Sequence, residues 1–162
     1  MAAGRTHTPI ATQTLGSAAA SVTFSSIPST YTDLVVVCNP IESGTSNLVW
    51  AQVNGDTGAN YSDTVIYGTG SAANSTRHTG VNWIYAFLTS DTGNKNTIIQ
   101  FMNYSNTTTY KTVIARSNST ANYVQAGVYL WGNTDAITSI LLSAQGTFPI
   151  GSTFSLYGIA AA

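Results

Sequence analysis

The chain has 162 residues, which is enough for one domain with a substantial core. Charged residues make up 7% of it and the net charge is −1, while 43% of the residues are hydrophobic, so the composition excludes intrinsic disorder. The five basic residues are scattered and form no patch that could neutralise several phosphates, so we expect no nucleic-acid partner.

Short apolar or alternating segments recur along the chain between clusters of Gly, Asn, Ser and Asp, and helical periodicity is nearly absent. This spacing is typical of a β-sandwich or barrel. The expected strands cover residues 8–15, 21–27, 34–38, 48–53, 64–67, 81–89, 97–104, 112–115, 123–131, 137–142 and 154–159. We therefore predict an all-β, antiparallel, jelly-roll-like sandwich of about eight to eleven strands.

Three segments outside this strand pattern have their own interpretation. Residues 1–20 are rich in Ala, Thr and Ser, and we expect an extended N-terminal arm or a first edge strand, followed by the sandwich domain at 21–162. Residues 68–80 and 105–110 are polar and are expected to be exposed loops, where recognition commonly takes place. No segment approaches the roughly 18 apolar residues of a membrane helix, so we expect no membrane partner.

Several predicted strands carry apolar side chains on both faces. In residues 97–104, Ile98 and Met102 alternate with Ile99 and Phe101. One face of a sandwich strand fills the core, so the second face needs another sheet, a loop or another copy of the chain. Because a net charge near zero gives little repulsion between copies, we expect a homo-oligomer.

The sequence contains no recognisable catalytic constellation. No Gly-x-Ser-x-Gly elbow is present, and most aspartates lie in turn sequences, where Asp is favoured for backbone reasons. A glycosidase needs two carboxylates facing each other across a sugar, and no pair lies mid-strand. His78 is expected to be a solvated loop residue, and Cys38, within an apolar run, a buried hydrophobe. We predict that the protein is not an enzyme and has no cofactor.

One segment invites a metal hypothesis. Residues 54–60 imitate the start of a calcium-binding EF-hand loop, but Val65 stands where the bidentate glutamate should be. The favoured interpretation is a turn held by side-chain hydrogen bonds, without a metal. The alternative is a looser oxygen site formed by Asp56, Asn60 and Asp63.

The candidate contacts to a partner or a glycan are Trp83, Tyr85, Arg77, His78, Tyr110 and Tyr123. Trp83 and Tyr85 share one strand face, and such an aromatic stripe either packs into the core, which is the favoured interpretation, or stacks on sugar rings. Arg77 and His78 belong to the expected loop at 68–80. Tyr110 and Tyr123 are expected to be exposed.

Three stretches carry a resemblance to a known group of proteins: residues 22–34 (VTFSSIPSTYTDL), 53–62 (VNGDTGANYS) and 148–159 (FPIGSTFSLYGI). In order and spacing they resemble small virion proteins of tailed bacteriophages. The resemblance implies a jelly-roll sandwich that serves as a capsid decoration (cement) protein or as the end of a fibre. It supplies no catalytic residues.

From this resemblance we expect a decoration protein that forms a homo-oligomer, a trimer, on the major capsid protein and stabilises the head. It would be made in the bacterial host cytoplasm, since the N-terminus lacks the apolar region of a signal peptide, and would lie on the outer surface of the virion. The first alternative is a fibre or receptor-binding module that recognises host-surface glycans through residues 68–80 and 105–110. The second is a carbohydrate-active enzyme.

Overall fold

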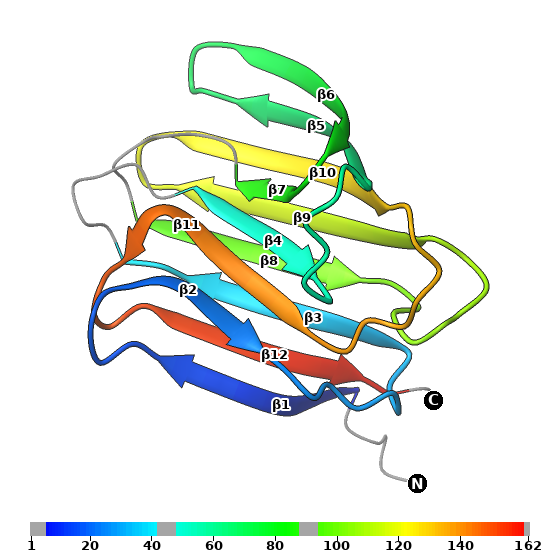
Figure 1. The fold of residues 1–162 in the computed structure, drawn as a ribbon. Coiled ribbons are helices and arrows are strands. Elements are labelled where there is room, and N and C mark those ends of the chain that lie inside the picture. The colour runs from blue at the N-terminus through cyan, green and yellow to red at the C-terminus, as the bar shows by residue number, and fades with distance from the viewer. Residues whose placement is uncertain (1–5, 42–47, 88–93, 161–162) are drawn as a thin grey trace, which may run out of the picture.

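A computed structural model describes residues 6–41, 48–87 and 94–160 of the chain. These ranges contain twelve strands, which pair antiparallel in two sheets that face each other (Figure 1). The expected all-β, jelly-roll-like sandwich is confirmed. No helix that could span a membrane occurs in the described ranges.

The two sheets differ in size. The larger sheet has eight strands in the spatial order β1 (His7–Thr14), β12 (Thr153–Ile159), β3 (Asp33–Asn39), β8 (Lys95–Phe101), β9 (Lys111–Ser119), β10 (Tyr123–Trp131), β5 (Tyr61–Gly68) and β6 (Ala73–Val81). The smaller sheet has the order β2 (Ala19–Phe24), β11 (Ile140–Phe148), β4 (Val49–Val53) and β7 (Ile84–Phe87).

The core lies between the sheets and follows from the period of two along each strand. On β9 and β10 buried and exposed residues alternate along the whole strand. On β3, Leu34, Val36 and Cys38 are fully buried. Cys38 is therefore the buried hydrophobe that its apolar neighbours predicted, and burial raises the pKa of its thiol.

The smaller sheet does not cover the whole inner face of the larger one. Its last strand, β7, contacts β5, β9 and β10, and β6 lies at the rim beyond them (Figure 1). Inward residues of β6, such as Thr76 and His78, are consequently half-buried, whereas those of β9 and β10 are buried. At this rim, inward side chains of β6 are therefore partly accessible to solvent.

The prediction that residues 68–80 form a loop is wrong. Residues 73–81 are strand β6, which pairs with β5 through Val65↔Thr76 and Thr64↔Arg77. A turn closed by a 2.9 Å bond from Thr69 N to Ala72 O joins the two strands. An edge strand at the rim needs no apolar face, so a polar sequence forms it without the alternation by which strands are recognised.

The loop at 105–110 is present and is held by one side chain. Asn106 Oδ1 accepts bonds from the backbone N–H groups of Thr108 (2.7 Å) and Thr109 (2.9 Å). The same oxygen also accepts from both threonine hydroxyls. This segment is a built turn whose polar residues serve its own backbone.

The N-terminal segment belongs to both sheets in the described ranges. Residues 7–14 form the edge strand β1 on β12, with a register shift between Pro9 and Ala11, and residues 19 and 20 already lie in β2. Proline suits this position because it cannot donate to a ladder. Residues 1–5 of the expected arm lie outside the described residues, as do positions 88 and 89 of the strand expected at 81–89.

Candidate functional site

The outer face of the larger sheet, directed away from the smaller sheet, carries an apolar stripe along β10 that one large apolar side chain of β5 and one of β9 widen. Five of the nine large hydrophobic side chains exposed in the described chain lie there: Ile66, Ile114, Val124, Val128 and Leu130. Together with the exposed Ala126 they are called the outer patch. Ile66 opposes Ala126 and Ile114 opposes Val128 in the strand register, so the patch is continuous.

This patch is more than the scattered apolar exposure of an ordinary surface. Ile66 is 62% exposed and Val128 54% exposed, values unusual for β-branched residues in the middle of long strands. Monomeric proteins seldom expose apolar side chains contiguously over several strands. The patch therefore has the character of an interface.

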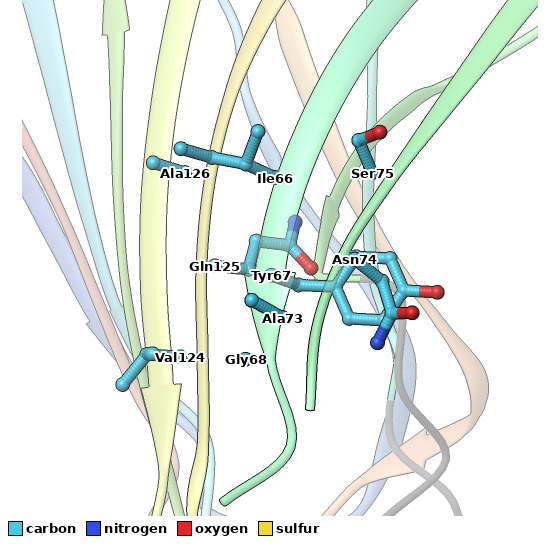
Figure 2. A pocket seen from close by; sticks show the side chains of 9 residues that line it. All are labelled: Ile66, Tyr67, Gly68, Ala73, Asn74, Ser75, Val124, Gln125 and Ala126. Carbon is cyan, nitrogen blue, oxygen red and sulfur yellow. The ribbon is translucent and has the colours of Figure 1, made fainter. Parts of the chain in front are cut away.

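Two grooves run along the outer patch. The larger, with a volume of about 740 Å³, lies between β10, β5 and β6; its lining residues are Ile66, Tyr67, Gly68, Ala73, Asn74, Ser75, Val124, Gln125 and Ala126. Figure 2 shows Ile66, Val124 and Ala126 on one side of β5 and Tyr67 and Asn74 on the other. A smaller groove, about 310 Å³, is bordered by Thr64, Arg77, Val128 and Leu130. The outer patch thus has two grooves that can receive side chains of a partner.

The charges around the outer patch are positive. Arg116 on β9 and Arg77 on β6 are outward-facing, since they pair with Ala126 and Thr64, which also face outward. The outward positions of β5, β9 and β10 include no Asp or Glu. Arg77 was grouped with Trp83 and Tyr85 as a glycan candidate. Successive residues of a strand alternate, so Arg77 lies on the face of β6 opposite His78, whose ring contacts that of Tyr85.

A second feature lies at the rim, between the smaller sheet and β6. The ring of Trp50 on β4 lies 5.5 Å from that of Trp83 and 6.0 Å from that of Tyr85 on β7. The Tyr85 ring lies 5.2 Å from that of His78 on β6. These four residues, all partly exposed, are called the rim cluster.

The rim cluster changes the interpretation of the aromatic stripe. Trp50 and Trp83 belong neither to the buried core nor to the partly buried residues packed on it, whereas Tyr85 packs against the core. The favoured expectation, a stripe within the core, is therefore wrong for Trp83. The physical reason is the alternation along β7: Ile84 and Ala86 are fully buried, so Trp83 and Tyr85 belong to the other face of the smaller sheet.

His78 is held by a buried carboxylate. Its Nδ1 lies 2.8 Å from Oδ1 of Asp63, whose side chain is 1% exposed. Oδ2 of Asp63 is buried without a hydrogen-bond partner. The expectation of a solvated loop histidine is thus wrong. Burial and the nearby charge of Asp63 both raise the pKa of Tyr85.

Asp56 and Asn60 form a turn and do not join Asp63. Asp56 accepts bonds from the Asn60 amide (2.9 Å), from Gly58 N (2.9 Å) and from Trp131 Nε1 (2.7 Å). Partial burial raises the pKa of Asp56, but these three bonds outweigh burial and lower it overall. Among the described residues no three His, Cys, Asp or Glu side chains are grouped as metal ligands, and the interpretation as a hydrogen-bonded turn accounts for Asp56 and Asn60.

The two tyrosines expected to be exposed differ. Tyr110, at the end of the 105–110 loop, is 59% exposed. Tyr123 is 6% exposed and stacks on Tyr67 at 5.6 Å, so the expectation of an exposed Tyr123 is wrong. Tyr123 is in phase with Tyr129 and Trp131 on the inward face of β10, and that alternation was the signal for its burial.

Sequence reasoning missed Trp50 and the partnership of Asp63 with His78. The alternation in residues 48–53 identified a strand around Trp50 but not its neighbours. The Asp63–His78 pair depends on the register between β5 and β6, which could not be inferred while residues 68–80 were interpreted as a loop. The outer patch, in contrast, was visible in the apolar residues on both faces of 123–131.

No model of a protein family matches the chain, and no curated protein matches it in sequence. Among solved structures, it is similar to the galectin LEC-6 of Caenorhabditis elegans, at 9% identity and a TM-score of 0.38 over 98% of this chain and 99% of the galectin. It is also similar to the PL-14 alginate lyase of Aplysia kurodai, at 8% identity and a TM-score of 0.37 over 84% of this chain and 72% of the lyase. Similarities this distant carry no argument about function.

Proposed function

We propose that the chain is a structural protein of a tailed-bacteriophage virion, which forms a homo-oligomer through the outer patch and decorates the head by binding the major capsid protein. The outer patch is the observation that carries the proposal. The three stretches that resemble phage virion proteins supply the biological setting, and the rigid antiparallel sandwich suits a subunit of a shell.

The chemistry of the outer patch favours association between copies. Each of Ile66, Val124 and Val128 exposes more than half of its surface, and burying such a side chain contributes about 1.5–3 kcal/mol at full burial. Few side chains with charged groups must be desolvated, because Arg116, opposite Ala126, and Arg77, opposite Thr64, are the charged residues at the outward positions of β5, β6, β9 and β10. A near-neutral chain adds little long-range repulsion.

The two arginines favour a ring over a twofold dimer. In a twofold interface the same surface meets itself, so that Arg77 and Arg116 of both copies enter one interface whose outward positions on β5, β9 and β10 include no Asp or Glu. In a ring of three, the surface of one subunit meets a different surface of the next, which avoids this repulsion. The resemblance to virion proteins implies a ring of three, so the proposed state is a trimer.

Three of the four described aspartates are bound within the fold, which supports a structural role. Asp33 accepts bonds from Gln100 Nε2 (3.0 Å) and from Asn103 N (2.8 Å). Asp56 and Asp63 are likewise bound within the fold. Each of these groups positions a turn or a neighbouring strand.

The test is a charge placed in the outer patch. Val128→Lys should convert the oligomer to monomer in size-exclusion chromatography with light scattering. Ile150→Lys is the matched control, because Ile150 is 64% exposed on the loop between β11 and β12, outside the patch. An oligomer unaffected by Val128→Lys, or a wild-type monomer at high concentration, would contradict assembly through this face.

The virion setting has its own test. Quantitative mass spectrometry of purified virions of the phage that encodes this chain should find hundreds of copies in a fixed ratio to the major capsid protein. A few copies per particle would instead indicate a fibre or tail-tip protein. Absence of the chain from purified particles would contradict the proposed setting altogether.

A further inference from the structure

We propose that the rim cluster is a binding site for a neutral pyranose sugar, with Trp50, Trp83 and Tyr85 as the apolar platform and His78 with the Tyr85 hydroxyl as the polar edge. This function goes beyond assembly and uses different residues. His78 lies on the face of the larger sheet opposite the outer patch. Trp50 and Tyr85 lie on strands of the smaller sheet, on the face opposite its buried residues Ala51 and Ile84.

The apolar half of the site is a set of angled rings. The Trp50 and Trp83 rings are inclined by 44°, and those of Trp50 and Tyr85 by 84°, so the rings do not form a closed parallel stack. All three remain partly exposed. The electron-rich face of an aromatic ring attracts the slightly positive C–H groups of a sugar. Two of the three tryptophans of the chain are thus placed at the rim, where core packing does not require them.

The polar half begins with His78. A carboxylate only accepts hydrogen bonds, so Nδ1 of His78 carries the proton in its 2.8 Å contact with Asp63. In the neutral ring Nε2 is then an acceptor, and the His78 side chain is 33% exposed. A sugar hydroxyl can donate to Nε2 in an orientation that Asp63 fixes through Nδ1.

Two buried polar atoms near the platform lack a partner. These are Oδ2 of Asp63, beside His78, and Nε1 of Trp50. One is an acceptor and the other a donor, and buried groups of this kind usually have a partner from the protein or from solvent. Both atoms are closed to solvent in this conformation, so a small side-chain movement is needed to reach them. A hydroxyl-rich ligand would stabilise that movement, since each hydroxyl both donates and accepts.

The charges select the class of sugar. Asp63 is the acidic group that contacts the rim cluster. Arg77, the nearest arginine in sequence, faces the opposite side of the sheet. An acidic sugar or a phosphorylated ligand would be repelled by the Asp63 carboxylate, and Arg77 cannot compensate from the opposite face. The site is therefore suited to neutral hexoses.

The experiment starts with the full chain on an array of neutral and acidic oligosaccharides, where an oligomer binds with avidity. The affinity for the neutral oligosaccharides that bind is then measured by isothermal titration calorimetry. Trp83→Ala should weaken binding at least about tenfold, because it removes one wall of the platform, and Tyr85→Phe about threefold, because it removes one hydroxyl. Tyr110→Ala is the matched control, an exposed aromatic residue outside the rim cluster, and should leave affinity unchanged.

Several results would overturn the proposal: no binding to neutral glycans, a preference for acidic ones, or binding that survives both Trp83→Ala and Tyr85→Phe. Loss of binding in Tyr110→Ala alone would place the site at the 105–110 loop. Circular dichroism shows whether each variant is folded. If Trp83→Ala does not fold, Tyr85→Phe still tests the site, because it removes a hydroxyl and keeps the ring. Val128→Lys should still bind sugar as a monomer and Trp83→Ala should still oligomerise, so failure of either proposal is seen separately.

Discussion

The indole Nε1 of Trp131 donates a 2.7 Å hydrogen bond to Oδ2 of Asp56. Trp131 ends β10 in the larger sheet, and Asp56 lies in the turn through which the chain crosses from β4 of the smaller sheet to β5 of the larger one. The bond therefore fixes a crossing between the sheets. It also explains why a residue that imitates a calcium ligand in sequence has a structural role.

This relationship predicts an acid-sensitive stability. The folded pKa of Asp56 is lowered, so its stabilisation is present above the unfolded value of about 3.9 and is lost as pH falls through the folded value. Asp56→Ala should cost about 2 kcal/mol at neutral pH, since it removes hydrogen bonds to a charged group. Asp56→Asn keeps one acceptor and should cost less, and it should flatten the acid dependence of the unfolding free energy. An unchanged acid slope in Asp56→Asn would show that Asp56 is not the titrating group.

The Asp63–His78 pair predicts an unequal result for single and double variants. His78→Ala leaves the buried Asp63 carboxylate with neither oxygen paired, and losing one member of such a pair costs about 3 kcal/mol. The double variant with Asp63→Ala removes the stranded charge as well and should be more stable than His78→Ala alone. Urea unfolding of the three proteins measures the difference. Additive losses would mean that the two residues do not interact.

A glycine on the inward face of β10 makes room for an aromatic ring. A Cβ on Gly127 would lie 2.5 Å from Oη and 2.7 Å from Cζ of Tyr129. That hydroxyl donates a 2.9 Å bond to the carbonyl of Tyr85, which links the two sheets. Gly127→Ala should therefore destabilise the fold by about 2 kcal/mol through overpacking.

The control for this change is Gly16→Ala, because no atom beyond its chain neighbours lies within 4 Å of a Cβ there. Its unfolding midpoint in denaturant should stay within the error of the wild-type value or rise slightly. Equal losses at both glycines would show that the Tyr129 ring is not responsible.

The sequence predicted the strands that have apolar residues and failed where a strand has none. The alternation in residues 123–131 identified β10 and both of its apolar faces, and so anticipated the outer patch. The polar segment at 73–81 gave no such signal, because at the rim a strand is held by its backbone ladder with β5 alone. The two pairings that depend on β6, Asp63 with His78 and Tyr85 with His78, were hidden by the same error.

The rim cluster shows a second limit. Trp50 and Trp83 lie far apart in sequence and meet because β4 and β7 are neighbours in the smaller sheet. Local patterns specify which face of a strand a residue occupies, but not which strand lies beside it. The burial of Tyr123 was within reach of the alternation of β10, whereas the exposure of Trp83 required the knowledge that Ile84 and Ala86 form the core-facing side of the segment.

The buried position of Cys38 allows a prediction about the reactivity of its thiol in the folded protein. The thiol is fully buried on β3, and burial raises its pKa, so the reactive thiolate is scarce even at mildly alkaline pH. In native protein, alkylation with iodoacetamide should proceed only through opening of the sandwich and should slow when stabilising osmolytes are added. Fast labelling without denaturant would contradict a closed core at β3.

The raised pKa of the Cys38 thiol also affects stability: this group stabilises the fold below the unfolded thiol value of about 8.5 and loses that contribution as pH rises further. Cys38→Ala should therefore make the fall of the unfolding free energy at alkaline pH less steep. The fall at acid pH, which is assigned to Asp56, should be unchanged.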